Sequence, residues 1–263
     1  MLQKHLLLAI NAAIEAGAEI MKYYSQGFEV EIKNDNTPVT EADKASNKII
    51  ESWLLKSGFP ILSEEGYIPD YEERKSWDYW WCVDPLDGTK GFIKKNGEFA
   101  ISIALMKNEF PVVGLIYLPT SQQIVFNWEN EVFIGKLEEA YADLNQVLNG
   151  LKKATIRKRT DPFKVLTSRN NVATLFENHI NDLKMDHDNI ELVQVGSAIK
   201  FYRMAAGEAN QYPRFQGSME WDIAAGQAIS EALGFETIDV ISKKRLKYNR
   251  PDLLNPHFII RAV

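Results

Sequence analysis

The chain has 263 residues, of which 45% are apolar, 11% aromatic and 25% charged. These proportions are typical of an ordinary globular protein, and they exclude a disordered or fibrous chain. The length allows one or two domains whose core needs no disulfide or zinc ion for stability. Thirty Lys and Arg against thirty-six Asp and Glu give a net charge of -6, which argues against nucleic-acid binding. A small anion can still bind where a local feature reverses the sign of the charge.

The single cysteine and the N-terminal region indicate the cellular compartment of the protein. Cys82 lies in an apolar run without an adjacent basic residue, so we expect a buried, unreactive thiol and a reducing compartment. The first helical segment contains charged residues, and no apolar run of 18 residues occurs, so we expect no signal peptide and no transmembrane segment. The sequence thus favours the cytoplasm and leaves peripheral contact with the inner face of the membrane open. The basic run at 157–159 is interpreted as a solvated charge run.

Hydrophobic periodicity predicts the elements of the first half of the chain. Apolar residues at steps of three and four indicate a helix over 1–24, and a second helix over 41–57 is bounded by Thr40 as N-cap and Gly58 as terminator. Short apolar runs that end in polar turns predict two strands, at 60–62 and 79–83. Four more strand-like runs are expected to form an antiparallel meander, at 99–106, 112–118, 123–127 and 131–134.

A polar stretch over 136–161 is the candidate boundary between an N-terminal α+β lobe (1–150) and a C-terminal α/β lobe (151–263). Strands and helices alternate after it, with strands predicted at 163–167, 192–195 and 210–212 and helices at 172–183, 197–206 and 221–233. Two final strands are predicted at 237–241 and 257–260. Alternating helices and sheets indicate a layered α/β or α+β architecture that forms one compact unit.

The turn Asp84-Pro85-Leu86-Asp87-Gly88-Thr89 directly follows an apolar strand. Proline fixes φ and glycine permits a sharp bend, so the turn can bring two carboxylates and the Leu86 carbonyl to one side. These hard oxygen ligands suit Mg²⁺. A plain β-turn whose aspartates cap backbone N–H groups explains the hexapeptide equally well.

Two further acidic turns have ordinary explanations when taken singly. Glu64 and Glu65 fit a solvated turn after a strand, and Asp222 fits a helix cap. Sheet ends and helix starts are, however, where α/β proteins gather ligands. The combination therefore predicts that the three turns converge.

The three ordered motifs, Ser63-Glu64-Glu65, the 84–89 turn and Trp221-Asp222-Ile223-Ala224-Ala225-Gly226, resemble the signatures of the inositol monophosphatase-like, lithium-sensitive phosphatases over nearly the full chain. The segments at 89–99, 196–201 and 212–215 are most similar to the bacterial 3'(2'),5'-bisphosphate nucleotidases. Those enzymes mostly have Glu where Gly91 stands, a departure that touches no expected ligand. The resemblance implies an αβαβα sandwich of the inositol monophosphatase/fructose-1,6-bisphosphatase type.

The resemblance also implies a set of metal ligands. One Mg²⁺ is expected on Glu64, Asp84 and the Leu86 carbonyl, and a second on Asp84, Asp87 and Asp222. Asp43 with Glu64 is the expected weaker site for a third ion. Two carboxylates about 4 Å apart repel by roughly 4 kcal/mol at an effective dielectric constant near 20, so four of them need cations. Bound Mg²⁺ inverts the local charge and favours a phosphate dianion.

Direct hydrolysis of a phosphate ester by water that the metal acidifies is the implied reaction. By resemblance, Thr89 is oriented by Asp43 and helps to remove the proton of this water. From the residues alone, Asp43 fits a capping box after Thr40 equally well. The backbone N–H groups of Gly88 and Thr89 are expected to meet phosphate oxygens.

Residues that contact the substrate are implied in both halves of the chain. Ser197 and Lys200 are expected near the nucleotide, Arg214 near its second phosphate or ribose, and Arg169 near the base. For Lys200 and Arg214, an ordinary exposed cation is an equally good interpretation. The resemblance also places some site residues beside the phosphate that is cleaved, namely Glu64, Leu86, Asp87, Gly88, Thr89 and Asp222.

The leading hypothesis is a Mg²⁺-dependent phosphatase that converts adenosine 3',5'-bisphosphate to AMP and phosphate in sulfur assimilation, with the 5'-phosphosulfate analogue as a further candidate substrate. One alternative is an inositol or sugar monophosphate phosphatase with the same chemistry. An alternative of another class is a non-catalytic nucleotide or metal sensor. The expected partner is thus a small phosphate ester, and the sequence does not distinguish a monomer from a homodimer.

Overall fold

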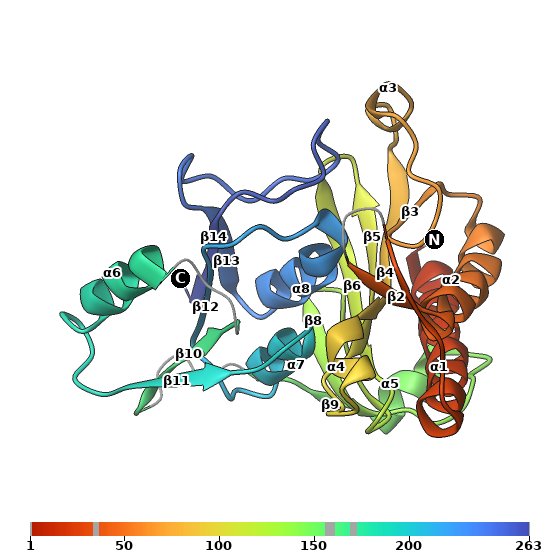
Figure 1. The fold of residues 1–263 in the computed structure, drawn as a ribbon, viewed down its shortest axis with the longest axis horizontal. Coiled ribbons are helices and arrows are strands. Elements are labelled where there is room, and N and C mark those ends of the chain that lie inside the picture. Colours follow the sequence, from red (N-terminus) through yellow and green to blue (C-terminus); the bar gives the residue numbers. More distant parts are fainter. Residues whose placement is uncertain (1, 34–36, 156–160, 169–172, 263) are drawn as a thin grey trace.

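A computed structural model describes residues 2–33, 37–155, 161–168 and 173–262 of the chain. Helices and sheets alternate in five layers (Figure 1). Helices α1 (Leu2–Gln26) and α2 (Glu41–Leu54) cover one face of a seven-stranded sheet. Helices α7 (Ile199–Ala205) and α8 (Glu220–Ala232) separate it from a five-stranded sheet, and α6 (Ala173–Leu183) lies on the far side of that second sheet. The predicted layered αβαβα sandwich is confirmed.

The seven-stranded sheet has the order β3-β4-β5-β6-β7-β8-β9. Its strands are β3 (Ile61–Ser63), β4 (Tyr79–Asp87), β5 (Ala100–Lys107), β6 (Phe110–Leu118), β7 (Gln123–Trp128), β8 (Glu131–Lys136) and β9 (Lys152–Lys153). Only the β3–β4 pair is parallel, so the carboxyl ends of these two strands meet at one edge of the sheet. The antiparallel pairing from β5 to β8 confirms the predicted meander.

The five-stranded sheet has the order β11-β10-β12-β14-β13. Its strands are β10 (Phe163–Thr167), β11 (Ile190–Gln194), β12 (Gln211–Arg214), β13 (Phe235–Asp239) and β14 (Phe258–Ala262). Strand β10 pairs in parallel with β11 and β12, whereas β14 pairs antiparallel with β12 and β13. This mixed pairing follows from the alternation of strands and helices in the second half of the chain.

Strand β4 is buried on both faces, which explains its unbroken apolar run. Trp80 and Cys82 point into the core shared with α7 and α8, whereas Trp81 and Val83 point into the core under α1 and α2. Burial raises the pKa of the Cys82 thiol well above its usual range. The expectation of a buried, unreactive cysteine is confirmed.

Several short elements were not predicted from the periodicity. They are β1 (Val30–Ile32), β2 (Pro38–Thr40), α3 (Tyr71–Arg74), α4 (Thr89–Ile93) and α5 (Leu144–Gly150). The helix predicted over 41–57 is α2 followed by the 3-10 helix η1 (Leu55–Ser57), and it ends at Gly58 as expected. The polar stretch at 136–161 contains both α5 and β9, and β9 pairs with β8. The division into two lobes at this stretch therefore stays a prediction, and the basic run at 157–159 lies outside the described residues. No helix in the described ranges is long and apolar enough to span a membrane.

Helix α8 approaches the seven-stranded sheet closely where β6 has a glycine. A Cβ atom built on Gly114 would lie 2.0 Å from the carbonyl oxygen of Ala225. This contact brings α8 near enough for its first turn to reach the ends of β3 and β4.

The substitution Gly114→Ala should therefore push α8 away from β6. We expect the free energy of unfolding to fall by about 1–3 kcal/mol, the usual cost of overpacking a core. Urea unfolding followed by circular dichroism measures this change. The control is Gly150→Ala, because a Cβ on Gly150 meets nothing within 4 Å. Equal stability of the two variants would contradict the close-packing argument.

Candidate active site

The 84–89 turn interrupts the ladder between β4 and β5. Asp84 lies opposite Ser102 and Asp87 opposite Ala100, with a shift of register between them. The carboxylate of Asp84 accepts a hydrogen bond from the Leu86 N–H at 3.0 Å, and Gly88 bends the chain with a left-handed φ of 98°. The turn therefore holds the Asp84 side chain at the carboxyl end of the strand.

Glu64 and Asp222 reach the same place from two other elements. Glu64 follows β3, and its N–H donates to the Val83 carbonyl of the parallel neighbour β4 at 3.1 Å. Asp222 lies in the first turn of α8 and accepts a hydrogen bond from the Met219 N–H at 2.8 Å. One carboxylate oxygen from each of Glu64, Asp84 and Asp222 lies within 4.8 Å of the others. We call these three residues the acidic cluster.

The electrostatics of the acidic cluster oppose its ionisation when no cation is present. Burial, together with the negative charges of Asp87 and Glu64, raises the pKa of Asp222 to about 8. Burial and the charges of Glu64 and Asp87 raise the pKa of Asp84 well above its usual range. Burial also raises the pKa of Glu64, although the ammonium group of Lys33 opposes this effect. Close carboxylates with raised pKa values indicate a site that needs an external positive charge.

The donor set of the acidic cluster fits Mg²⁺. Carboxylate oxygens are the hard ligands that this ion prefers, and the Leu86 carbonyl lies in the same turn. Asp87 is not part of the cluster, although its charge raises the pKa of Asp84 and Asp222. Its Oδ2 instead accepts a hydrogen bond from the Ala198 N–H at the start of α7. The assignment of individual ligands to individual ions stays a prediction.

Asp43 and Thr89 form a direct hydrogen bond beside the acidic cluster. The Thr89 hydroxyl lies 2.9 Å from Asp43 Oδ1 and 3.3 Å from the Leu86 carbonyl oxygen. Asp43 Oδ2 accepts hydrogen bonds from the Thr40 N–H and hydroxyl, which forms the capping box of α2. The capping and the Thr89 contact thus use different oxygens of one carboxylate, so the two interpretations of Asp43 are compatible. Burial raises the pKa of Asp43 despite these hydrogen bonds.

Lys33 is a site residue that the sequence analysis missed. Its ammonium group lies 3.1 Å from Glu64 Oε1 and 2.5 Å from Glu65 Oε1, and its side chain is about a quarter exposed, at 23%. Lys33 lies just after β1, in a polar stretch without periodicity. No local signal in the sequence distinguishes it from a solvated lysine.

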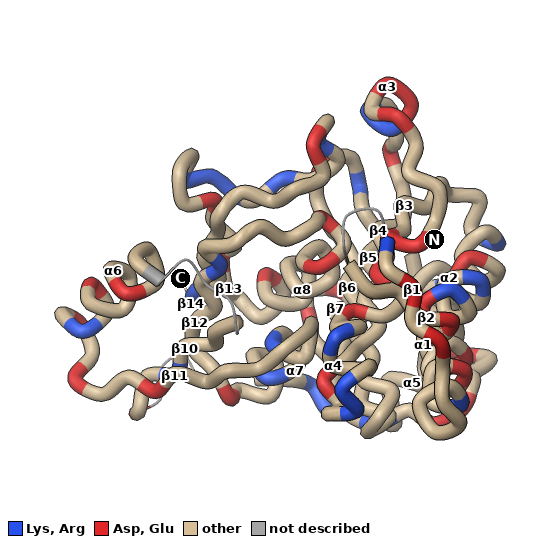
Figure 2. Tube along the Cα trace, in the orientation of Figure 1, with Lys and Arg blue, Asp and Glu red and all other residues tan. Residues whose placement is uncertain are grey.

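A cavity of about 430 Å³ opens beside the acidic cluster. Asp87, Gly88 and Asp222 line it at one end, and exposed lysines of and just after α4, Lys90 and Lys94, line another part. Figure 2 shows basic positions along α4, and residues of α7 line the same cavity. The volume lies within the range of small-molecule sites. Lys90 and Lys94 were also missed as site residues, because the local sequence pattern indicates neither α4 nor the cavity that these lysines line.

The predicted substrate-contacting residues of the second half also line this cavity, but two of them have partners within the protein. Lys200 is buried, and its ammonium group donates to the carbonyl oxygens of Val195 at 3.1 Å and Ser197 at 2.9 Å. Arg214 Nη1 donates to the Ser168 hydroxyl. The interpretation of Lys200 as an exposed cation is therefore wrong. Its contact with a nucleotide, like those of Ser197 and Arg214, stays a prediction, and Arg169 lies outside the described residues.

Comparison with known proteins identifies the class. Residues 1–261 match the model of the inositol monophosphatase family, and the chain belongs to that family. The crystal structure of CysQ from Bacteroides thetaiotaomicron is 40% identical and superposes with a TM-score of 0.88, covering 99% of this chain and 97% of that one. The 3'(2'),5'-bisphosphate nucleotidase CysQ of Escherichia coli K12 is 35% identical over 250 residues, 94% of this chain and 95% of its own. The corresponding protein of Buchnera aphidicola is 37% identical over 229 residues, 84% of this chain and 79% of its own.

Mg²⁺ binding should release protons at neutral pH. A carboxyl group with a pKa of about 8, such as that of Asp222, is mainly protonated at pH 7, whereas a bound cation requires the carboxylate. We expect the apparent Mg²⁺ affinity to rise with pH until Asp222 is ionised. Calorimetric titration in two buffers of different ionisation enthalpy measures the protons released.

The same groups should make the metal-free protein less stable as pH rises. The pKa values of Asp84 and Asp222 are higher in the folded protein than in the unfolded chain. At a pH between the folded and unfolded pKa values, unfolding therefore releases protons. The thermal midpoint in a chelator should therefore fall between about pH 6 and about pH 8.5, and Mg²⁺ should oppose this fall. A midpoint that rises over this range, with no proton release on Mg²⁺ binding, would contradict the assignment.

Proposed function

We propose that the protein is a Mg²⁺-dependent phosphatase that hydrolyses adenosine 3',5'-bisphosphate to AMP and phosphate. The observation that carries this proposal is the acidic cluster beside a cavity that is lined by one cluster residue, Asp222, and also by cations. Relatives named CysQ, at 35–40% identity over nearly the whole chain, support the choice of a nucleotide substrate. The function in sulfur assimilation and the activity on the 5'-phosphosulfate analogue stay predictions.

Bound Mg²⁺ supplies the positive charge that offsets the carboxylates, acidifies water and stabilises charge on the phosphoryl group. Thr89 can orient the attacking water, because its hydroxyl proton points to Asp43 and its lone pairs remain available as acceptors. As the water oxygen bonds to phosphorus, its proton can pass to the Thr89 oxygen and the hydroxyl proton to Asp43. The raised pKa of Asp43 makes it a better base than an ordinary aspartate.

The bond between phosphorus and the ribose oxygen breaks in the same step, and the ribose oxygen takes a proton from solvent. We assign the N–H groups of Gly88 and Thr89, at the start of α4, to oxygens of the phosphate being cleaved, and Gly88 lines the cavity. The Leu86 carbonyl and Asp87 complete the set of groups that we infer beside the phosphate being cleaved.

The second phosphate of the substrate needs cations that the acidic cluster cannot supply. We assign this contact to Lys90 and Lys94, which line the cavity and are exposed, with Arg214 as a further contributor. Lys200 instead holds the loop before α7 through its bonds to backbone carbonyls. A substrate with two separated phosphates fits this arrangement better than a monophosphate.

The test is phosphate release from a panel of esters, with and without Mg²⁺. We expect adenosine 3',5'-bisphosphate to be hydrolysed faster than inositol 1-phosphate, and only with the metal. The substitution Asp84→Asn should lower turnover by roughly a hundredfold or more at saturating Mg²⁺, because it removes a charged ligand. Faster release from inositol phosphate would overturn the substrate assignment, and tight nucleotide binding without phosphate release would favour a sensor.

Replacement of the two exposed lysines, Lys90 and Lys94, should raise KM for a bisphosphate substrate more than KM for a monophosphate. In the double variant Lys90→Gln/Lys94→Gln, we expect KM for adenosine 3',5'-bisphosphate to rise about tenfold, a loss of about 1.4 kcal/mol. For adenosine 3'-monophosphate the change should stay below about twofold, since no second phosphate is present. Steady-state phosphate release measures both.

The matched control is Lys152→Gln/Lys153→Gln, which removes the same charge from exposed positions on β9. Its KM for both substrates should equal that of the unsubstituted protein. An equal rise of KM for the two substrates in the α4 variant would show that Lys90 and Lys94 do not bind the second phosphate.

A further inference from the structure

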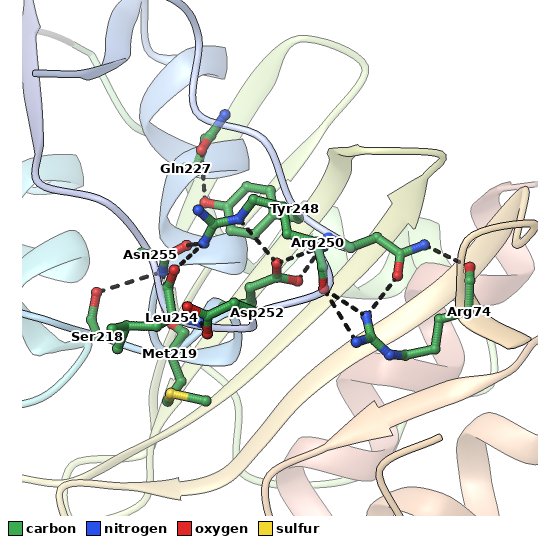
Figure 3. Close-up of polar contacts among 11 residues, drawn as sticks. Arg74, Ser218, Met219, Gln227, Tyr248, Arg250, Asp252, Leu254 and Asn255 are labelled. Atoms are coloured by element: carbon green, nitrogen blue, oxygen red, sulfur yellow. Dashed lines mark hydrogen bonds and ion pairs between the residues drawn. The ribbon is translucent and has the colours of Figure 1, made fainter. Parts of the chain in front are cut away.

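The segment at 246–255, which we call the strap, runs along α8 and is fixed to it by side chains (Figure 3). The Tyr248 hydroxyl lies 2.7 Å from Gln227 Oε1 in the middle of the helix. At the helix start, Asn255 Nδ2 donates to the Met219 carbonyl at 2.8 Å and the Asn255 N–H donates to the Ser218 carbonyl at 2.7 Å. Met219 is the residue whose N–H holds the Asp222 carboxylate.

Glu220, the first residue of α8, is completely buried, and both of its carboxylate oxygens bind the strap. Oε2 accepts the Asn249 N–H at 2.8 Å, and Oε1 accepts the Arg250 N–H at 3.1 Å. The two bonds set the position of the first turn of α8, and therefore of Asp222, relative to the strap.

Arg74 joins the strap to the chain segment between β3 and β4, which begins with Glu64. Although it belongs to α3, on the chain segment that follows Glu64, its side chain is only 2% exposed. Its guanidinium group donates to the Pro69 carbonyl at 2.9 Å and to Asn249 Oδ1 at 2.9 Å. Asn249 Nδ2 returns a bond to the Arg74 carbonyl at 2.7 Å. Each of the two residues thus donates a hydrogen bond to the other and accepts one from it.

Arg74, Asn249 and Glu220 therefore form a continuous buried chain of hydrogen bonds, which we call the clasp. One end of the clasp holds the segment that follows Glu64, and the other end holds the turn that carries Asp222. These two carboxylates belong to the acidic cluster and repel each other when no cation lies between them. The β3–β4 pairing and the capping bond hold Glu64 and Asp222 within their own elements, and the clasp connects the segments that follow and precede them to each other.

We propose that the clasp is a positioning device that keeps Glu64 and Asp222 at the spacing at which a divalent cation binds. Arg74, Asn249 and Glu220 form their hydrogen bonds within the protein, and the clasp acts without contacting the metal or the substrate. The inference rests on Mg²⁺ binding at the acidic cluster under the proposed function. A clasp that only stabilised the fold would change the thermal midpoint without changing the affinity of the folded protein for Mg²⁺.

The variant Asn249→Gly tests the clasp without altering charge. Asn249 has a left-handed φ of 55°, a conformation that glycine adopts without strain, so the substitution removes only the side chain that bonds to Arg74. We expect the dissociation constant for Mg²⁺, measured by calorimetry on the substrate-free protein well below its thermal midpoint, to rise about tenfold. Turnover at saturating Mg²⁺ should change by less than about twofold.

Asn130→Gly is the matched control, because Asn130 also has a left-handed φ, 63°, and is exposed in the turn between β7 and β8. Its Mg²⁺ affinity should equal that of the unsubstituted protein. A lower thermal midpoint of Asn249→Gly with unchanged Mg²⁺ affinity would overturn the clasp alone. Absence of Mg²⁺ binding by the unsubstituted protein would overturn the proposed function as well.

A second variant, Arg74→Lys, completes a double-mutant cycle with Asn249→Gly. Lysine keeps the charge but cannot bond to Pro69 and Asn249 with the geometry of the guanidinium group. Arg74 also donates to the Arg250 carbonyl, and Asn249 also bonds to the Arg74 carbonyl, so each single variant loses bonds that the other keeps. Because the two side chains share the bond between them, the loss of Mg²⁺ affinity in the double variant should be smaller than the sum of the two single losses. Fully additive losses would show that Arg74 and Asn249 act independently, and the clasp would be refuted.

Discussion

The repulsion among buried carboxylates is the constraint on which the rest of this structure depends. Glu64, Asp84 and Asp222 come from three elements, and their oxygens lie within 4.8 Å of one another. An arrangement of this kind is unfavourable unless the backbone holds each group and an external cation offsets the charge. The bulge after Asp84, the parallel β3–β4 pair and the capping box at Asp222 each hold one member.

The same backbone features satisfy local needs of the fold. Asp222 caps α8, Asp84 accepts a bond within its own turn, and Asp43 caps α2 while its second oxygen meets Thr89. In each case the ordinary structural interpretation and the functional one are compatible, because a carboxylate has two oxygens. Helix capping at this site is therefore a means of orienting side chains as well as a source of stability.

Sequence reasoning predicted the long elements because hydrophobic periodicity defines them, as in α1, α8 and the meander from β5 to β8. It predicted the three acidic turns and their convergence, because sheet ends and helix starts are where α/β proteins gather ligands. It missed α3 and Arg74, because tertiary bonds to Asn249 bury an arginine in a segment that otherwise resembles a solvated charge run. It missed Lys33 for the same reason: its partner Glu64 lies beyond the reach of any local pattern.

The strap at 246–255 has a consequence for biosynthesis. Its residues are synthesised after α3 and α8, yet they bind the first turn of α8 and the buried arginine of α3. A chain clipped within this region would lose the hydrogen bonds that connect the first turn of α8 to α3. Under the clasp proposal, the affinity for Mg²⁺ would therefore report whether the strap is intact and folded onto α3 and α8.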